Sequence, residues 1–111
     1  MKALQWTMTI PKDKQAVFIE WFKEIAGPTF GKFGATKHEM FKVSDQQLIS
    51  KQLTEENRFI ERVYFKDNFD VASYFTKVKS DPEAWSLSRM YESEFGARDI
   101  ELKVLEGIEL R

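Results

Sequence analysis

The chain has 111 residues, a formal net charge of −1, 42% apolar residues and no cysteine. This length fits one domain with its own core, so we expect a single domain over residues 1–111. The near-neutral charge argues against nucleic acid as a partner, and the apolar runs are too short to span a bilayer. The lack of cysteine excludes disulfides and thiolate metal sites.

Apolar and polar residues alternate over 4–10, which predicts a first strand. The strand begins directly after Met1-Lys2, which leaves no signal peptide, so a cytoplasmic protein is expected. From Lys14 the apolar spacing becomes helical, with Asp13 as the predicted N-cap and Gly27-Pro28 as the predicted stop. Trp6 and Trp21 fall on the apolar stripes of these elements and are predicted to be core residues.

The middle of the chain predicts a hairpin. A second strand is expected over 36–43, with an extended piece at 47–53 as its continuation. A turn at 54–57 then leads into a third strand over 58–66. Asn68 or Asp70 is the predicted cap of the short helix that follows.

The last third predicts a long helix and a final strand. Asp81 fits the N-cap with Pro82 in the first turn, and Gly96 ends the helix. Four apolar positions mark the buried side of this helix: Ala84, Leu87, Tyr91 and Phe95. A strand over 100–105 completes the order β-α-β-β-α-β, which is the ferredoxin-like split fold: α+β, with an antiparallel sheet and helices on one face.

The third strand, "RFIERVYF", has apolar residues on both faces. In the ferredoxin-like topology this strand is central, so its Phe59 face packs on the helices. Ile60 and Tyr64 lie on the other face, which a second copy of the chain, a ligand, or both should cover. Glu61 lies on the helix face, where a charge is costly unless it is paired or lies at the sheet edge, and a helix lysine or arginine is its expected partner.

The chain resembles the dimeric α+β barrel superfamily, and within it the antibiotic-biosynthesis-monooxygenase-like and stress-responsive barrel domains. The resemblance covers nearly the whole chain and rests on its topology, on "FGKFGATKHEM" leading into the second strand, on the break "SDPEAW", and on the mixed outer sheet face. It implies a homodimer whose two sheets enclose a pocket. Haem-degrading relatives carry a histidine before the helix break, whereas this chain has Lys77 in "YFTKVKSDP", so haem degradation is not implied.

Several side chains are expected on the sheet face away from the helices, where they would form a polar floor for a small aromatic ligand. In this interpretation Arg62 stabilises an anion and Tyr64 donates to a carbonyl. Alternatively, Arg62 pairs with Glu101 or with the partner subunit and only sets the strand register. The floor is predicted to consist of Gln5, Thr7, Arg62, Tyr64, Glu101 and Lys103.

His38 is the only histidine and is the candidate general base. If Met40 shares its face, the two would look into the barrel; otherwise His38 is a hydrogen-bonded or exposed strand residue. Trp85 either flanks the ligand or packs at the core edge. One histidine without a metal-binding spacing predicts no metal site, and no cofactor is expected.

Two functions are compatible with these residues. The first is a small cofactor-free, monooxygenase-like enzyme or binding protein for a hydrophobic, aromatic or polyketide-like molecule. A carbanion-like substrate held by Arg62 and Tyr64 would react directly with oxygen, with His38 as the proton acceptor. The alternative is a non-catalytic structural or stress-responsive barrel in which the same residues form only a dimer interface.

Overall fold

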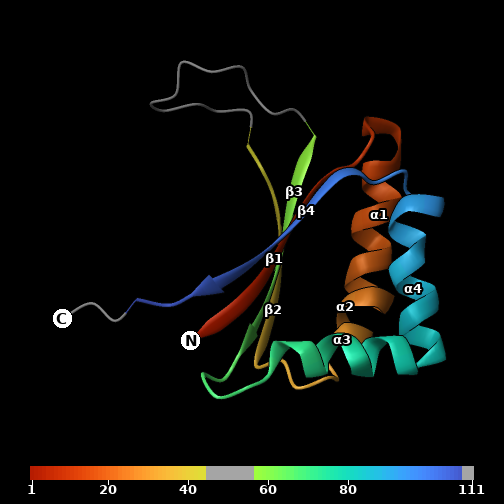
Figure 1. Ribbon diagram of the computed structural model, residues 1–111. Coiled ribbons are helices and arrows are strands. Elements are labelled where there is room, and N and C mark those ends of the chain that lie inside the picture. The colour runs from red at the N-terminus through yellow and green to blue at the C-terminus, as the bar shows by residue number, and fades with distance from the viewer. Residues whose placement is uncertain (45–56, 109–111) are drawn as a thin grey trace.

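The computed structural model describes residues 1–44 and 57–108 (Figure 1). Its strands are β1 (Lys2–Thr9), β2 (Lys37–Lys42), β3 (Arg58–Phe65) and β4 (Arg98–Glu106). Its helices are α1 (Gln15–Trp21), α2 (Gly27–Phe30), α3 (Val71–Ser80) and α4 (Pro82–Ser93), with a 3₁₀ turn at Lys12–Lys14 and a π-helical turn at Phe22–Ala26. The predicted extended piece at 47–53 and most of the turn at 54–57 lie outside the described residues.

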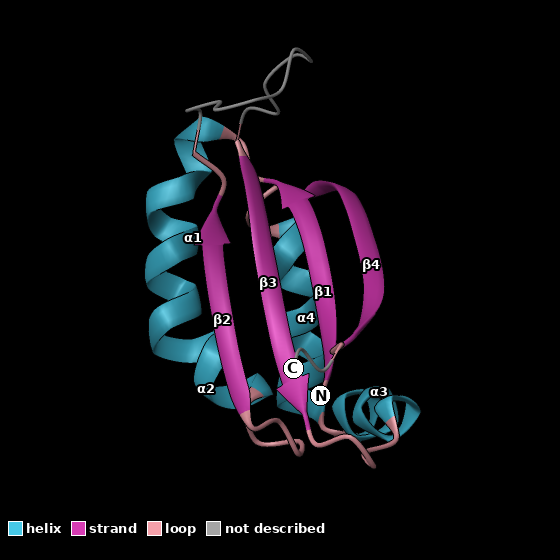
Figure 2. Ribbon diagram, turned by 90° about the vertical axis from the view of Figure 1, so that its left-hand side faces the viewer, coloured by secondary structure: helices cyan, strands magenta, loops and turns pink. Residues whose placement is uncertain are grey.

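The four strands form one antiparallel sheet in the order β2-β3-β1-β4, and the helices cover one of its faces (Figures 1 and 2). This confirms the predicted ferredoxin-like α+β fold and the central position of β3. No helix among the described residues is long and apolar enough to cross a membrane.

The core lies between the sheet and the helices. Leu4 and Met8 of β1 and Phe59 of β3 are almost fully buried on the helix face. Phe18 of α1 meets the ring of Phe59 edge to face, with their centroids 5.4 Å apart. Phe18 also contacts the rings of Tyr91 and Phe95 at 5.9 and 5.6 Å, so aromatic contacts join α1 to the end of α4.

The first helix does not stop at Gly27-Pro28, contrary to the prediction. It widens through the π-helical turn and restarts as α2, where Pro28 lies in the first turn and needs no hydrogen-bonded N–H. A Cβ on Gly27 would lie only 3.0 Å from the carbonyl oxygen of Phe22, so glycine suits this close approach. Asp13 is also not the N-cap: it lies within the 3₁₀ turn, and α1 begins without a side-chain cap.

The caps of α3 and α4 match the prediction. Of the two candidates, Asp70 caps α3 by accepting the backbone N–H of Ala72 at 3.0 Å. Asp81 accepts the N–H of Ala84 at 2.9 Å, with Pro82 in the first turn of α4. The four predicted inward positions of the last helix are all buried. Helix α3 lies at one end of the sheet, and helix α4 lies against its helix-covered face (Figures 1 and 2). Both helices contribute to the site described next.

Candidate functional site

A cavity of about 250 Å³ lies between the sheet and helices α3 and α4. Its buried end is formed by β1, β3 and both helices, and its lining is mostly aromatic and aliphatic. The volume suits a molecule of one or two rings, since pockets for larger ligands usually start at about 300 Å³. The cavity is lined by Trp6, Met8, Phe30, Glu61, Tyr74, Phe75, Val78, Lys79, Trp85, Ser88, Tyr91, Glu92 and Ile100.

The cavity is apolar and buried at its floor and polar at its rim. Tyr74, Val78 and Tyr91 are buried among the floor residues. Lys79 and Glu92 are exposed, and their opposite charges stand at the rim. A ligand would therefore leave water as it enters and would meet one carboxylate at the floor, that of Glu61.

Glu61 lies on the helix face of β3, and its side chain is only 6% exposed. The Tyr91 hydroxyl donates to its Oε1 at 2.9 Å, and His38 Nε2 lies 2.7 Å from its Oε2. Burial of an unpaired carboxylate would cost several kcal/mol, so these contacts make its position possible. The prediction that Glu61 is paired is confirmed, but the predicted lysine or arginine partner is wrong: its described partners are a histidine of β2 and a tyrosine of α4.

The two tyrosines of the floor remain protonated at neutral pH. Burial raises the pKa of Tyr91 well above its ordinary value of 10.0, and the negative charge of Glu61 raises it further. The pKa of Tyr74 is also raised, first by burial and then by the same carboxylate. Both phenols can therefore donate hydrogen bonds, and neither supplies a base at neutral pH.

His38 shares the face of Met40, as the prediction required, but that face points toward the helices. His38 lies opposite Val63 in the β2–β3 ladder and Met40 lies opposite Glu61, so both are inward positions. The ring of His38 meets the edge of Phe22 at 5.1 Å, and its Nδ1 is buried without a hydrogen-bond partner among the described residues. His38 thus contacts Glu61 and lies on the opposite side of the sheet from Arg62 and Tyr64.

The residues of the predicted polar floor do lie together, but on the outer face of the sheet, on the side away from the cavity. Gln5 lies opposite Arg62, and Thr7 lies opposite Glu101. The Nε of Arg62 donates to Gln5 Oε1 at 2.7 Å, and its guanidinium lies over the ring of Phe41 at 5.6 Å. Arg62 therefore pairs with a neighbouring strand, and Gln5 rather than Glu101 is its partner.

Tyr64 and Glu101 also have local partners on this outer face. The Tyr64 hydroxyl is the main cause of the lowered pKa of the Glu39 carboxyl, because it hydrogen-bonds the ionised form. The ammonium of Lys37 lies 5.8 Å from the centre of the Tyr64 ring. These contacts leave the outer face tied together by strand-to-strand pairs, with no part in the cavity.

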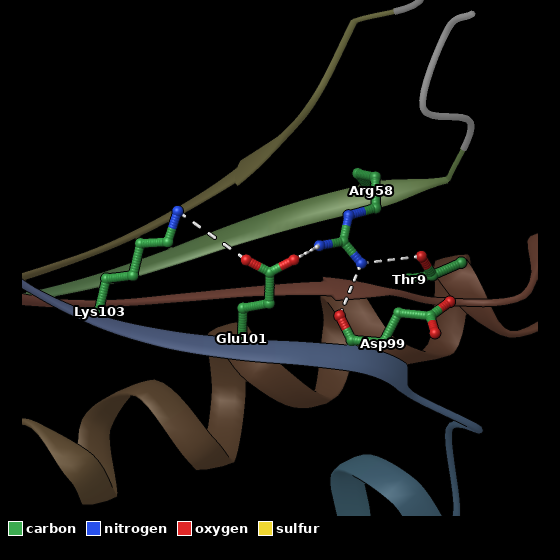
Figure 3. A network of polar contacts seen from close by, with 5 residues as sticks. All are labelled: Thr9, Arg58, Asp99, Glu101 and Lys103. Atoms are coloured by element: carbon green, nitrogen blue, oxygen red, sulfur yellow. Dashed lines mark hydrogen bonds and ion pairs between the residues drawn. The ribbon is translucent and has the colours of Figure 1, made fainter.

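A second polar network, around Arg58, joins three strands (Figure 3). Its guanidinium donates to Thr9 Oγ1 at 3.0 Å and to the carbonyl oxygen of Asp99 at 2.9 Å. Glu101 lies 4.0 Å from Arg58 and 3.9 Å from Lys103. Asp99 has a φ of +52°, so the network fixes the strained start of β4. The predicted ligand residue Glu101 thus belongs to a structural network that the sequence analysis did not identify.

The tryptophans divide between core and cavity. Trp21 is buried against Tyr91 and Phe95, as predicted. Trp6 is only partly buried; it lines the cavity and meets Phe75 edge to face at 6.3 Å. Trp85 is 43% exposed and lines the same cavity near its rim. Of the predicted ligand-binding residues, Trp85 is the one that reaches the cavity.

Residues that could bind a metal ion do not gather among the described residues, where no group of three histidine, aspartate or glutamate side chains converges. The acidic and hydroxyl groups of the cavity floor are instead suited to hydrogen bonding. Glu61, Tyr74 and Tyr91 were missed as a site by the sequence analysis. The one available sign was the charge of Glu61 in an otherwise apolar stripe.

Comparison with solved structures shows the same fold in monooxygenase-type proteins of low sequence identity. A putative antibiotic biosynthesis monooxygenase from Deinococcus radiodurans matches with a TM-score of 0.68 and 13% identity, over 100% of this chain and 96% of that one. One from Nitrosomonas europaea matches with a TM-score of 0.66 and 15% identity, over 98% and 100%. A dimeric ferredoxin-like protein from an uncultured marine organism matches with a TM-score of 0.61 and 12% identity, over 98% and 96%.

The chain matches no protein-family model and no curated protein sequence. At these identities the structural matches establish the fold alone, and this is the fold that the resemblance to antibiotic-biosynthesis-monooxygenase-type proteins implied.

Proposed function

We propose that this protein binds a small, flat, hydrophobic molecule in the cavity between the sheet and helices α3 and α4, and that it oxidises this molecule as a cofactor-free monooxygenase. The observation that carries the proposal is the cavity itself. It has a volume of about 250 Å³, a largely aromatic lining and one hydrogen-bonded carboxylate at its buried end. Mostly apolar clefts with a few convergent polar groups are typical of small-molecule sites. The description of two structural neighbours as putative antibiotic biosynthesis monooxygenases supports the reaction class.

The chemistry needs a substrate that loses a proton readily. In the proposed reaction, Glu61 accepts a proton from a methylene group activated by a neighbouring carbonyl or aromatic ring, and the carbanion reacts with O₂. The methylene becomes a carbonyl; one oxygen atom of O₂ enters the product and the other leaves as water, so no further reductant is required. Tyr74 supplies a protonated hydroxyl at the cavity floor for the charge that develops, while the Tyr91 hydroxyl donates to Glu61.

His38 has a different part in this proposal from the one expected from the sequence. It touches Glu61 from the side of β2 and does not line the cavity, so it positions the carboxylate. Arg62 and Tyr64 lie on the outer face, and we assign them to the contact between subunits.

The proposed subunit contact is a homodimer in which two outer sheet faces meet. Phe41 is 41% exposed on this face, and Ile60 and Tyr64 of the central strand are only partly buried there. One structural neighbour is described as dimeric. Light scattering should therefore give twice the chain mass of 13.1 kDa; a clean monomer would exclude this contact.

The cavity can be tested by filling it. Ser88 lines the cavity, whereas Ser86 lies two residues away on the exposed side of α4. Ser88→Trp should abolish oxygen uptake with aromatic ketones that carry an activated methylene, measured with a chelator present. Ser86→Trp is the matched control and should retain the wild-type rate. Equal rates in the two variants would place the reaction elsewhere, and no uptake with any such substrate would refute the oxygenase assignment.

The bound molecule can be sought directly. Native mass spectrometry of the purified protein should show an additional small-molecule mass in wild type and in Ser86→Trp, and should not show it in Ser88→Trp. The same additional mass in all three proteins would show that the molecule binds outside the cavity.

A further inference from the structure

The charge at the floor of the cavity has one sign. Glu61 supplies the only ionised side chain at that depth among the described lining residues. Lys79 and Glu92 are exposed at the rim, where their charges oppose each other and water screens them. A ligand that reaches the floor is therefore selected by a buried carboxylate, in surroundings where charge interactions are strong.

The described hydrogen bonds of Glu61 use only part of its capacity. An ionised carboxylate has about four acceptor positions on its two oxygens. Tyr91 and His38 each engage one oxygen. Glu61 also lines the cavity, so acceptor positions remain for a group that enters from that side.

The walls above Glu61 are aromatic. Trp6 and Phe75 meet edge to face, and Tyr74 and Trp85 complete the lining on the helix side. Aromatic faces stack on flat apolar bodies and attract cations through their quadrupoles. An anion gains nothing from these faces and is repelled by the carboxylate.

We infer that Glu61 determines which molecules this cavity accepts: the ligand has a flat apolar body and a head group that donates a hydrogen bond or carries a positive charge, and molecules with an anionic head group are excluded. The inference rests on the proposed binding function and adds the polarity of the ligand to it. A hydroxyl and a protonated amine share the required donor chemistry.

The test uses four probes with one body and different head groups: naphthylmethylamine, naphthylmethanol, naphthoate and methylnaphthalene. Their affinities for the whole chain are measured by titration calorimetry. The amine and the alcohol should each bind at least about tenfold more tightly than naphthoate, since a buried carboxylate repels a second one. Methylnaphthalene measures what the cavity contributes without any head group.

Glu61→Gln keeps the shape of the side chain and removes its charge. The advantage of the amine over methylnaphthalene should then fall by about tenfold. Glu94→Gln removes the same charge from an exposed position that does not line the cavity, and should leave the ranking unchanged. Near-ultraviolet circular dichroism shows whether each variant is folded. If Glu61→Gln does not fold, the order of the four probe affinities in the wild-type protein still decides the inference.

Three outcomes would overturn the inference. Naphthoate could bind wild type as tightly as the amine and the alcohol, or Glu61→Gln could fold and keep the wild-type ranking. In either case binding of methylnaphthalene would leave the proposed binding function standing. If none of the four probes binds, the binding function itself fails and the inference fails with it.

Discussion

Glu61 and Arg62 are adjacent in β3, yet they face opposite sides of the sheet and solve the problem of a partly buried charge differently. Glu61 points toward the helices, where a tyrosine of α4 and a histidine of β2 contact its two oxygens. Arg62 points outward, where it shares one hydrogen bond with Gln5 and lies over the ring of Phe41. The inner charge has one partner on the sheet and one on helix α4, whereas both described contacts of the outer charge lie on neighbouring strands of the sheet.

This contrast between the two faces shows where chemistry can develop on this fold. The inner carboxylate is held in a low-dielectric site beside a cavity, so its charge is strong and its position is fixed. The charges of the outer face are exposed or are arranged as strand-to-strand pairs, which contribute little to stability because water screens them. The same strand thus carries a candidate active group on one side and, on the other, the surface that we propose as the contact between subunits.

The largest effect should come from removing a partner of the inner charge. His38→Ala leaves the buried Glu61 carboxylate with Tyr91 as its only described partner, and should lower the free energy of unfolding by about 3 kcal/mol. Lys37→Ala, at the neighbouring exposed position, is the control and should change it by less than about 0.5 kcal/mol. Urea denaturation measures both. Similar losses for the two variants would show that the inner pair has no special role.

An intermediate effect is expected at alkaline pH. The pKa of Tyr91 is raised in the folded protein, so above pH 10.0 the folded state keeps a proton that the unfolded state has lost. Stability from this group is complete below pH 10.0 and falls as pH rises toward the higher native pKa, by at most about 1.4 kcal/mol per pH unit.

The variant Tyr91→Phe isolates that contribution. Its difference in unfolding free energy from wild type should stay constant from pH 7 to pH 9, as judged from the tyrosine reference value of 10.0, and should narrow above it. Urea denaturation from pH 7 to above pH 10.0 gives the unfolding free energy of each protein as a function of pH. Parallel curves above pH 10.0 would show that Tyr91 is not protected from ionisation.

The smallest effect should come from the outer face. Arg62→Ala removes one hydrogen bond to Gln5 and a contact with Phe41, and should lower the free energy of unfolding by less than about 1 kcal/mol. Thermal unfolding measures the change, and light scattering shows whether the proposed dimer persists. A loss as large as that of His38→Ala would mean that the two faces do not differ as described.

Much of the fold was predictable because local patterns carried it. Alternation marked β1, helical spacing marked α1 and α4, and the caps Asp70 and Asp81 were visible as side chains that accept N–H groups at helix starts. The continuation of the first helix past Gly27-Pro28 was not predictable from the glycine and the proline alone. A π-helical turn lets the chain restart with proline in a first turn, and packing of Ala26 and Phe30 into the core stabilises that path.

The candidate site was only partly predictable. The alternation of side chains along each strand predicted one shared face for five residues, and the strand register agrees. These residues are Gln5, Thr7, Arg62, Tyr64 and Glu101. The same alternation put His38 and Met40 on one face of β2, but it could not show whether that face points toward the helices or away from them. A shift of one residue between β2 and β3 reverses every side chain of β2, and the segment between these strands has no pattern that sets the register.

Patterns along the chain were therefore enough for the order of elements and for the unusual charge at Glu61, because these depend on neighbours within a few residues. The central place of β3 followed from the topology that this order implies. The meeting of Glu61 with His38 and Tyr91 and the cavity above it required the folded molecule. These residues come from β3, β2 and α4, up to 30 positions from Glu61 in the chain. Their distances depend on strand register and on how α4 packs against the sheet, and no local sequence preference encodes either.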